Sequence, residues 1–250
     1  MLNYFRADIR RILANKSHAF SMILLFAAFF AMLYIPGSTA QVTSVSLVAS
    51  ACSILDLMFT FFGLFELLVV FSEDFKVKTM QVAIGLGITR TQVVLCKLLE
   101  VMFLVVIDCI MLVLIVLGIA VSFGTGMPMV VLKDLILVLL VKGVISLAVN
   151  TSLTIIVLFV TQSTVLSIFV YVMIGLDIVS MLLMLGSMYG FDWIETFKLN
   201  RLTISYLIGV LHSRLALGQF SLQAFLGICA YIAVGLFGTC RLFGEQELDF

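Results

Sequence analysis

Five ionisable side chains and one asparagine lie inside stretches of the sequence that are otherwise strongly apolar. An ionised side chain at the centre of a bilayer costs on the order of 3 kcal/mol, so five of them facing lipid would cost about 15 kcal/mol. Such groups are therefore expected to pair, to hold a proton or to face water, and they can relay protons or contact a polar solute inside a membrane. The residues are Asp56, Glu66, Asp108, Lys142, Asn150 and Asp177.

Lys142 is the only cation in this set. It lies about nine residues inside a predicted helix, which is roughly 14 Å of helix rise, so its ammonium group cannot easily reach the membrane surface. We predict that it pairs with an acid of a neighbouring helix. Asp108 is favoured, because a short connection makes the third and fourth apolar segments neighbours, and Asp177 and Asp56 are the alternatives. Such a pair can fix helix packing or contact a solute.

The other acids have no basic partner within the apolar segments. They are expected to be protonated or to line a polar path along the second and fifth segments, and Glu66 can also reach the cytoplasmic interface. Asn150 is expected to join helices by hydrogen bonds rather than to bind a solute.

Signatures of catalysis and of nucleotide binding are missing from the sequence. The loop G-x-x-x-x-G-K-[ST], which cradles ATP phosphates, does not occur, and "GLGITR" and "FGTGMP" contain glycines but no lysine. There is no H-E-x-x-H motif and no serine-centred elbow. The five cysteines show no metal-ligand or disulfide spacing, so we expect small buried hydrophobic residues. We predict a chain that is not an enzyme and has no cofactor or metal of its own.

The composition requires a membrane to bury these segments. The chain of 250 residues is 63% hydrophobic and 11% charged, with a mean hydropathy of +1.28, whereas a soluble domain carries about 25% charged residues. We predict an all-α integral membrane protein with one domain over 1–250, and the zero net charge gives no sign of a nucleic-acid partner. The six predicted spans are 18–35, 48–72, 99–122, 133–160, 164–189 and 219–240, the first being retained rather than cleaved as a signal peptide.

The distribution of Lys and Arg predicts the orientation of the spans. With a cytoplasmic N-terminus, nine basic residues fall inside and four outside. We therefore expect a multi-pass protein of the plasma membrane with both termini and the 73–98 segment in the cytoplasm. The inside residues are Arg6, Arg10, Arg11, Lys16, Lys76, Lys78, Arg90, Lys97 and Arg241; the outside ones are Lys133, Lys198, Arg201 and Arg214.

Two segments outside the predicted spans have helical patterns of their own. In 1–17, the apolar residues Leu2, Phe5, Ile9, Ile12 and Leu13 share one stripe, which favours an amphipathic helix in the membrane surface over a plain basic anchor. The 190–218 segment is partly apolar but too short and charged for a further span, so we expect a re-entrant or surface-lying helical element there.

The 73–98 segment has the pattern of a short helix, a turn and a new helix. Glycines at 85 and 87 permit the backbone angles that end a helix, and Thr89 followed by Gln92 matches a capping box. Apolar residues between charges would suit docking into a partner's groove. A hairpin that only reverses the chain explains the pattern equally well. The expected apolar face holds Phe75, Thr79, Met80 and Ala83, and the charges are Glu73, Asp74, Lys76 and Lys78.

The layout resembles the type-2 permease subunits of ATP-binding-cassette (ABC) exporters. Those have a surface elbow helix, six spans, a cytoplasmic coupling helix between spans two and three, and a re-entrant outer element between spans five and six. The local match is a glutamate at the end of span two, a Gly-x-Ser/Thr-Arg turn and a lysine seven residues on. Here these are Glu73, Gly87, Thr89, Arg90 and Lys97. The small size resembles subunits of peptide and lantibiotic-immunity exporters.

The resemblance implies a half-transporter that works with two copies of a separate ABC ATPase, which would hold ATP and Mg. A second permease chain, identical or a sister, would complete a dimer. The implied cargo is hydrophobic or amphipathic, such as an antimicrobial peptide. The alternatives are a secondary transporter or channel that uses the buried acids as an ion or proton path, and a non-transporting membrane scaffold or enzyme accessory. The implied ATPase-coupling residues are Glu73, Asp74, Phe75, Lys76, Lys78, Thr79, Met80, Gly87, Thr89, Arg90 and Lys97.

Overall fold

The computed structural model describes residues 2–39, 43–77, 79–189 and 198–245; for residues 2, 39, 72–77 and 79 it describes the backbone only. These residues form helices and no strand, which confirms the predicted all-α class. The first half contains α1 (Leu2–Leu13), α2 (Lys16–Thr39), α3 (Ser44–Val77), α4 (Thr79–Gly85) and α5 (Arg90–Ser122). The second half contains α6 (Met129–Val138), the π-helix η1 (Leu139–Ile145), α7 (Ser146–Thr161), α8 (Thr164–Gly175), α9 (Ile178–Met188), the 3₁₀-helix η2 (Leu199–Leu202), α11 (Ile204–Ala216) and α12 (Leu222–Glu245).

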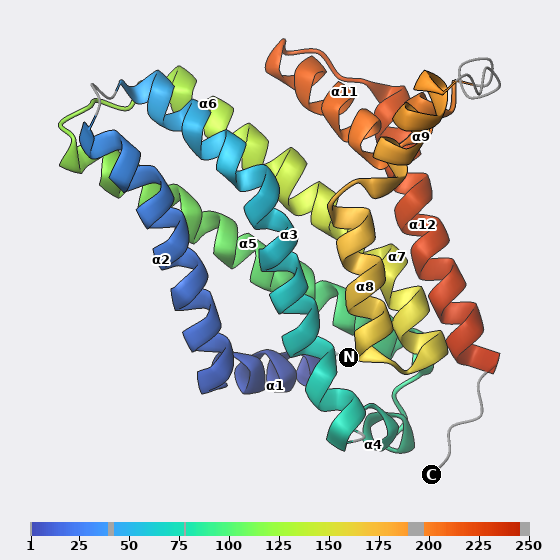
Figure 1. Cartoon of the computed structure of the whole chain (residues 1–250). Coiled ribbons are helices and arrows are strands. Elements are labelled where there is room, and N and C mark those ends of the chain that lie inside the picture. Colours follow the sequence, from blue (N-terminus) through green and yellow to red (C-terminus); the bar gives the residue numbers. More distant parts are fainter. Residues whose placement is uncertain (1, 40–42, 78, 190–197, 246–250) are drawn as a thin grey trace.

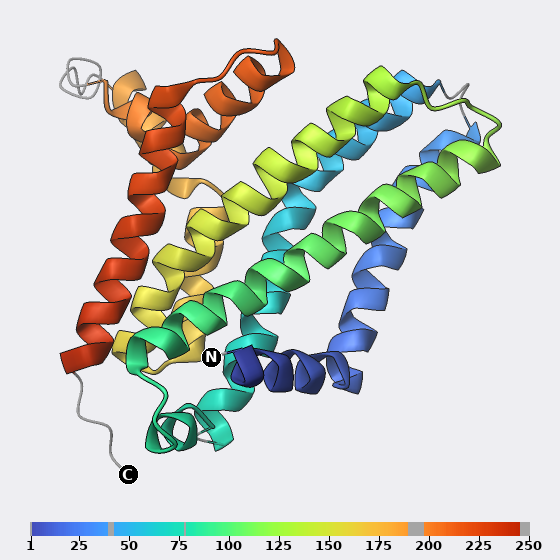
Figure 2. The ribbon, with the colours of Figure 1, turned by 180° about the vertical axis from the view of Figure 1, so that it is seen from behind.

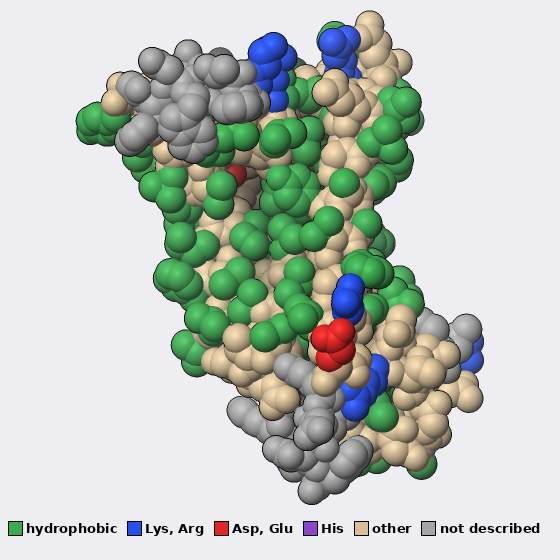
Figure 3. Space-filling view, turned by 90° about the vertical axis from the view of Figure 1, so that its right-hand side faces the viewer, with side chains coloured by type: hydrophobic (Ala, Val, Ile, Leu, Met, Phe, Trp, Pro, Cys, Tyr) green, Lys and Arg blue, Asp and Glu red, His purple; other side chains and the backbone are tan. Residues whose placement is uncertain are grey.

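Several of these helices are long and apolar enough to cross a membrane. Among the described residues, four qualify alone, within α2, α3, α5 and α12, and α8 with α9 makes a fifth if the bent pair is one span. Hydrophobic side chains cover much of the face shown in Figure 3, while Lys and Arg are seen near its top edge and in its lower part. The chain therefore has the helices of a multi-pass membrane protein. The six-span layout stays a prediction, since 133–160 is divided among α6, η1 and α7.

The helices define two ends of the molecule (Figure 1). The α4 end holds α1, α4 and the last turn of α12, and the α11 end holds α9 and α11. Between them, α2, α3 and α5 run lengthwise, and α6, η1 and α7 follow one another as a single rod (Figures 1 and 2). α12 packs closely on α7 because Gly235 has no side chain: a Cβ there would lie 2.5 Å from the Ser152 carbonyl oxygen.

Two helices continue beyond the predicted ends of their spans. The first span was expected to stop before Pro36, but α2 includes Pro36 and continues to Thr39. A proline removes one backbone donor, and near the end of a helix few bonds remain to be lost. The second span was expected to end at residue 72, and the candidate membrane span within α3 ends at Phe71. The helix itself continues to Val77, so the charged residues Glu73, Asp74 and Lys76 belong to it.

The predicted amphipathic helix at the N-terminus is present as α1, and its apolar face packs on protein. Ile9 and Ile12 are buried, and the ring of Phe5 meets the edge of Phe103 on α5 at 6.0 Å. Of the predicted stripe, Leu13 at the end of the helix is 53% exposed, and its position in the membrane surface stays a prediction. Because α1 is seated on α5, it is part of the bundle rather than a free anchor.

Candidate functional site

A polar pocket of about 510 Å³ brings together four of the predicted intramembrane residues, Asp56, Lys142, Asn150 and Asp177. It lies between α3, the η1–α7 rod, the connection from α8 to α9, and α11. Hydroxyl side chains and apolar side chains complete its wall. The lining residues with hydroxyl side chains are Ser53, Thr60, Ser146 and Ser205. The apolar lining residues are Leu57, Phe59, Leu147, Leu176 and Ile208.

Lys142 in η1 pairs with Asp56 on α3. Its ammonium nitrogen donates to both carboxylate oxygens, at 2.9 and 3.1 Å. The side chains remain 32% and 53% exposed, so the pair lines the pocket rather than lying in the core. The predicted pairing of Lys142 is confirmed, but its favoured partner Asp108 is wrong and Asp56, an alternative, is right. The chain neighbours α5 and η1 do touch, yet Asp108 is turned towards Glu66.

A broken helix forms the opposite wall of the pocket. α8 ends at Gly175, α9 begins at Ile178, and the two are bent by 53°. A break frees backbone groups that need partners inside a membrane. The Thr60 hydroxyl of α3 donates to the Gly175 carbonyl at 3.2 Å, and Asp177 takes up the left-handed turn with φ of 55°. Broken helices that face a polar cavity are typical of solute sites in transporters.

Asn150 on α7 supplies a buried amide to the same pocket. The residue is only 5% exposed, and its neighbour Thr154 hydrogen-bonds its backbone carbonyl. Within the described ranges, its side-chain amide forms no hydrogen bond, and the residue lines the pocket. Asn150 therefore does not join helices as expected, and its free donors and acceptor line the pocket.

His212 lies near this pocket on α11. Burial lowers the pKa of His212, and the positive charge of Lys142 lowers it further, while Asp56 and Asp134 act in the opposite direction. The imidazole is therefore mainly neutral at pH 7 and adds no positive charge.

A second buried cluster contains the other two predicted acids. His18 Nε2 on α2 lies 3.1 Å from Glu66 Oε1 on α3, and Asp108 on α5 interacts with the Glu66 carboxyl group. All three are buried, and Glu66 Oε2 and Asp108 Oδ2 have no hydrogen-bond partner within the described ranges. Adjacent carboxylates repel each other unless a proton lies between them. None of the three lines the polar pocket.

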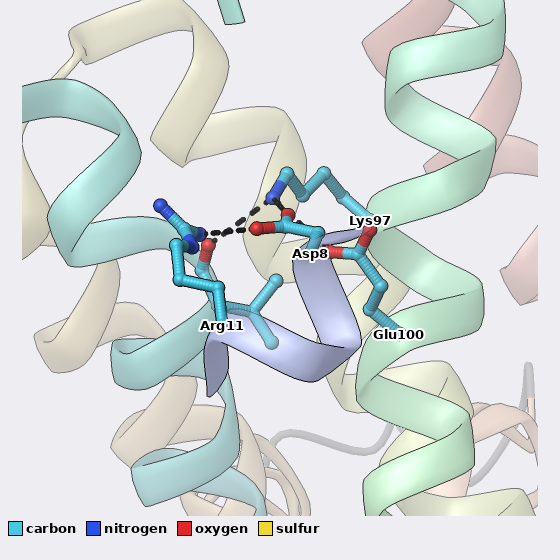
Figure 4. Close-up of polar contacts among 5 residues, drawn as sticks. Asp8, Arg11, Lys97 and Glu100 are labelled. Carbon is cyan, nitrogen blue, oxygen red and sulfur yellow. Dashed lines mark hydrogen bonds and ion pairs between the residues drawn. The ribbon is translucent and has the colours of Figure 1, made fainter. Parts of the chain in front are cut away.

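A third cluster ties α1 to α5 (Figure 4). Lys97 is fully buried, forms an ion pair with Asp8 of α1, and lies 3.1 Å from Glu100 Oε2. Arg11 pairs with Asp8 at 2.6 Å, so two acids face two bases. Lys97 was predicted among the ATPase-coupling residues, and the structure places it inside the protein. The sequence reading missed Asp8 and Glu100, although Glu100 follows Lys97 by one helical turn.

The predicted short helix and turn are present at the α4 end. α4 spans Thr79–Gly85, Gly87 has a positive φ of 94°, and Thr89 and Gln92 form the capping box of α5. Met80 and Ala83 are buried against the bundle, while Val82 and Leu86 are 61% and 81% exposed. The exposed apolar surface thus differs from the predicted one, which included Met80 and Ala83.

Arg90 connects this turn to the end of α12. Its Nη1 donates to the carbonyls of Phe243 at 2.7 Å and Gly244 at 3.0 Å. The guanidinium also lies 5.6 Å from the centre of the Phe243 ring. Six other predicted coupling residues have side chains outside the described residues: Glu73, Asp74, Phe75, Lys76, Lys78 and Thr79.

Comparisons with known proteins give this chain no family. No protein-family model matches it, and no curated protein matches it significantly.

Proposed function

We propose that this chain is the membrane subunit of an ATP-driven ABC exporter that moves an amphipathic cargo, with ATP and Mg held by a separate ATPase. The observation that carries the proposal is the unit formed by α4, its turn and the start of α5. Met80 and Ala83 fix this unit to the bundle, and Arg90 fixes it to α12. Movement of α4 would therefore be passed to the spans.

Docking of the ATPase would use the exposed part of the unit. Val82 and Leu86 offer apolar side chains at the α4 end, and an apolar helix face fits a partner's groove. Nucleotide binding by the partner would shift the bundle between two states that open the polar pocket to different sides. Two ATPase copies and a second permease chain, the same or a sister, would complete the exporter in the plasma membrane, with α4 and both termini in the cytoplasm.

The docking is tested by placing negative charges at Val82 and Leu86. The tagged chain is purified from its host membranes, and ATP hydrolysis by the copurified complex is measured for the wild type, V82D/L86D and the control L217D. Leu217 is 74% exposed and follows α11 at the other end. We expect V82D/L86D to lose the ATPase while L217D keeps it. Equal retention of an ATPase by both variants would refute docking at α4.

Charge in the 76–78 segment gives a second test of coupling. Reversal of Lys76 and Lys78 to glutamate should separate ATP hydrolysis from transport in reconstituted vesicles. Unchanged transport per ATP would count against this segment as the coupling element.

A second candidate function rests on the cluster of His18, Glu66 and Asp108. Its adjacent buried carboxyl groups could carry a proton in a secondary transporter. In vesicles without ATP, a proton gradient would then drive uptake of an amphipathic cargo by the wild type but not by E66Q. Absence of gradient-driven uptake in both would leave the ATP-driven proposal as the better account.

A further inference from the structure

The charges around the polar pocket are unbalanced. Lys142 is paired with Asp56 through both carboxylate oxygens, so these two charges offset each other. Asp177 also lines the pocket, and no basic side chain pairs with it within the described ranges. Asp134 adds a further negative charge nearby, and the neighbouring His212 is mainly neutral. The pocket therefore has a net negative charge.

Neutral groups of the pocket also point to a ligand. Asn150 is only 5% exposed as a residue, it lines the pocket, and its side-chain amide forms no hydrogen bond among the described residues. Its carbonyl oxygen can accept one hydrogen bond from a bound group. The Asp177 carboxylate can accept others, and bonds between charged groups are the strong ones.

We propose that this pocket binds the ammonium group of an amphipathic cation, with Asp177 as the counter-ion and Asn150 as a second acceptor. An ammonium group has three donors and one positive charge, which matches an unpaired carboxylate beside a buried amide. Leu57, Leu176 and Ile208 line the same pocket and would contact the apolar part of the ligand. That this cation is the transported cargo rests on the proposed exporter function. That the pocket binds it does not depend on that function.

Asp177→Asn is a well-matched test variant. Asp177 has a φ of 55° and precedes α9 as its N-cap, and asparagine tolerates the left-handed region and the N-cap position as well as aspartate does. The substitution therefore removes the charge without forcing a new backbone. Asp177→Glu keeps the charge, and Glu245→Gln removes an exposed acid at the far end of α12.

The experiment measures binding of radiolabelled octylamine to the full chain in lipid nanodiscs, with octanol and octanoate as competitors. We expect saturable octylamine binding that octanol and octanoate do not displace. D177N should weaken it about tenfold or more, since a charged hydrogen bond is lost, while E245Q should bind as the wild type does. D177N must keep the wild-type thermal unfolding midpoint for this comparison, and N150A provides a second variant that should weaken binding with Asp177 intact.

Two outcomes separate this inference from the proposed function. If octylamine binds equally to the wild type, D177N and N150A, or is displaced by octanol, the assignment is wrong even if an ATPase docks at α4. If binding depends on Asp177 but V82D/L86D and L217D retain the same ATPase activity, the cation site stands and docking at α4 fails.

Discussion

Two lysines in apolar helices show how one residue type serves two purposes. Lys97 is fully buried among Asp8, Glu100 and Arg11, whereas Lys142 remains 32% exposed in a pocket. A buried charge must keep its partners, because desolvation would otherwise dominate. A charge facing a pocket has room for a ligand or water. We therefore assign Lys97 to structure and Lys142 to the site.

Removal of the buried ammonium group should destabilise the fold. In K97M, Glu100 loses its ion pair with Lys97, and among the described residues Asp8 keeps its pair with Arg11; breaking a buried ion pair costs about 3 kcal/mol or more. The control R241Q breaks an exposed pair with Glu245 and should cost between about 0 and 1 kcal/mol. The measurement is the thermal unfolding midpoint in detergent. Equal midpoints for K97M and R241Q would contradict the structural role of this cluster.

Removal of the pocket lysine should have a smaller effect on stability. In K142M, Asp56 is left without its cation but is 53% exposed, so solvent offsets part of the loss. We expect a drop in the unfolding midpoint smaller than that of K97M, and recovery in D56N/K142M, where no charge is stranded. A drop as large as that of K97M would mean that the pair is a core contact.

At the scale of elements, small residues decide which helices touch. Gly235 lets α12 approach the α7 backbone, and Gly175 ends α8 where Thr60 of α3 can bond its carbonyl. Close approach through small residues is a common way to pack helices in membranes, where the lipid is as apolar as the side chains. The pocket wall and the α7–α12 contact both follow from such positions.

Addition of one methyl group at two glycines should give opposite results. In G235A the new Cβ would lie 2.5 Å from the Ser152 carbonyl oxygen, and overpacking costs about 1–3 kcal/mol. In G118A nothing lies within 4 Å of the new atom, and alanine favours the helix by about 1 kcal/mol over glycine. Unfolding midpoints should therefore fall for G235A and stay or rise for G118A. No fall for G235A would mean that α7 and α12 do not pack as described.

Local patterns allowed accurate prediction of some elements. The Thr89–Gln92 capping box and the glycine turn before it depend only on neighbouring residues, and both are found where the sequence places them. The π-helix and the break at residues 175–177 could not be predicted, because single polar residues such as Lys142 and Asp177 in long apolar runs give no periodic signal. The partner of Lys142 was missed for a related reason, since the face that a helix turns towards its neighbour depends on packing across the bundle.

At the scale of the whole molecule, the proposed partner contact and the proposed transmission meet at the α4 end. α1, α4 and the last turn of α12 all lie at this end (Figure 1). Lys97 joins α1 to α5, and Arg90 joins the end of α12 to α5. The polar pocket, by contrast, includes residues of α11 from the other end. Coupling between α4 and the polar pocket thus requires that the long helices between the two ends move as units.

The orientation in the membrane is tested by chemical labelling. Single cysteines are placed at Leu86 and Leu217, which are 81% and 74% exposed at opposite ends, in a chain whose native cysteines are replaced. A membrane-impermeant maleimide should label L217C in intact cells and L86C only after the cells are broken, because α4 is proposed to be cytoplasmic. Labelling of L86C in intact cells would reverse the orientation and place α4 out of reach of an ATPase.

The π-helix has a consequence for how the length of the chain can vary. Residues Leu139–Ile145 wind with wider turns than an α-helix, and such a turn holds one residue more than an α turn. Loss of one residue there would leave ordinary α turns and keep α6 and α7 in line, whereas a deletion in the middle of α5 would rotate everything after it by about 100°. Within the α6–η1–α7 rod, natural deletions of one residue are therefore expected at 139–145.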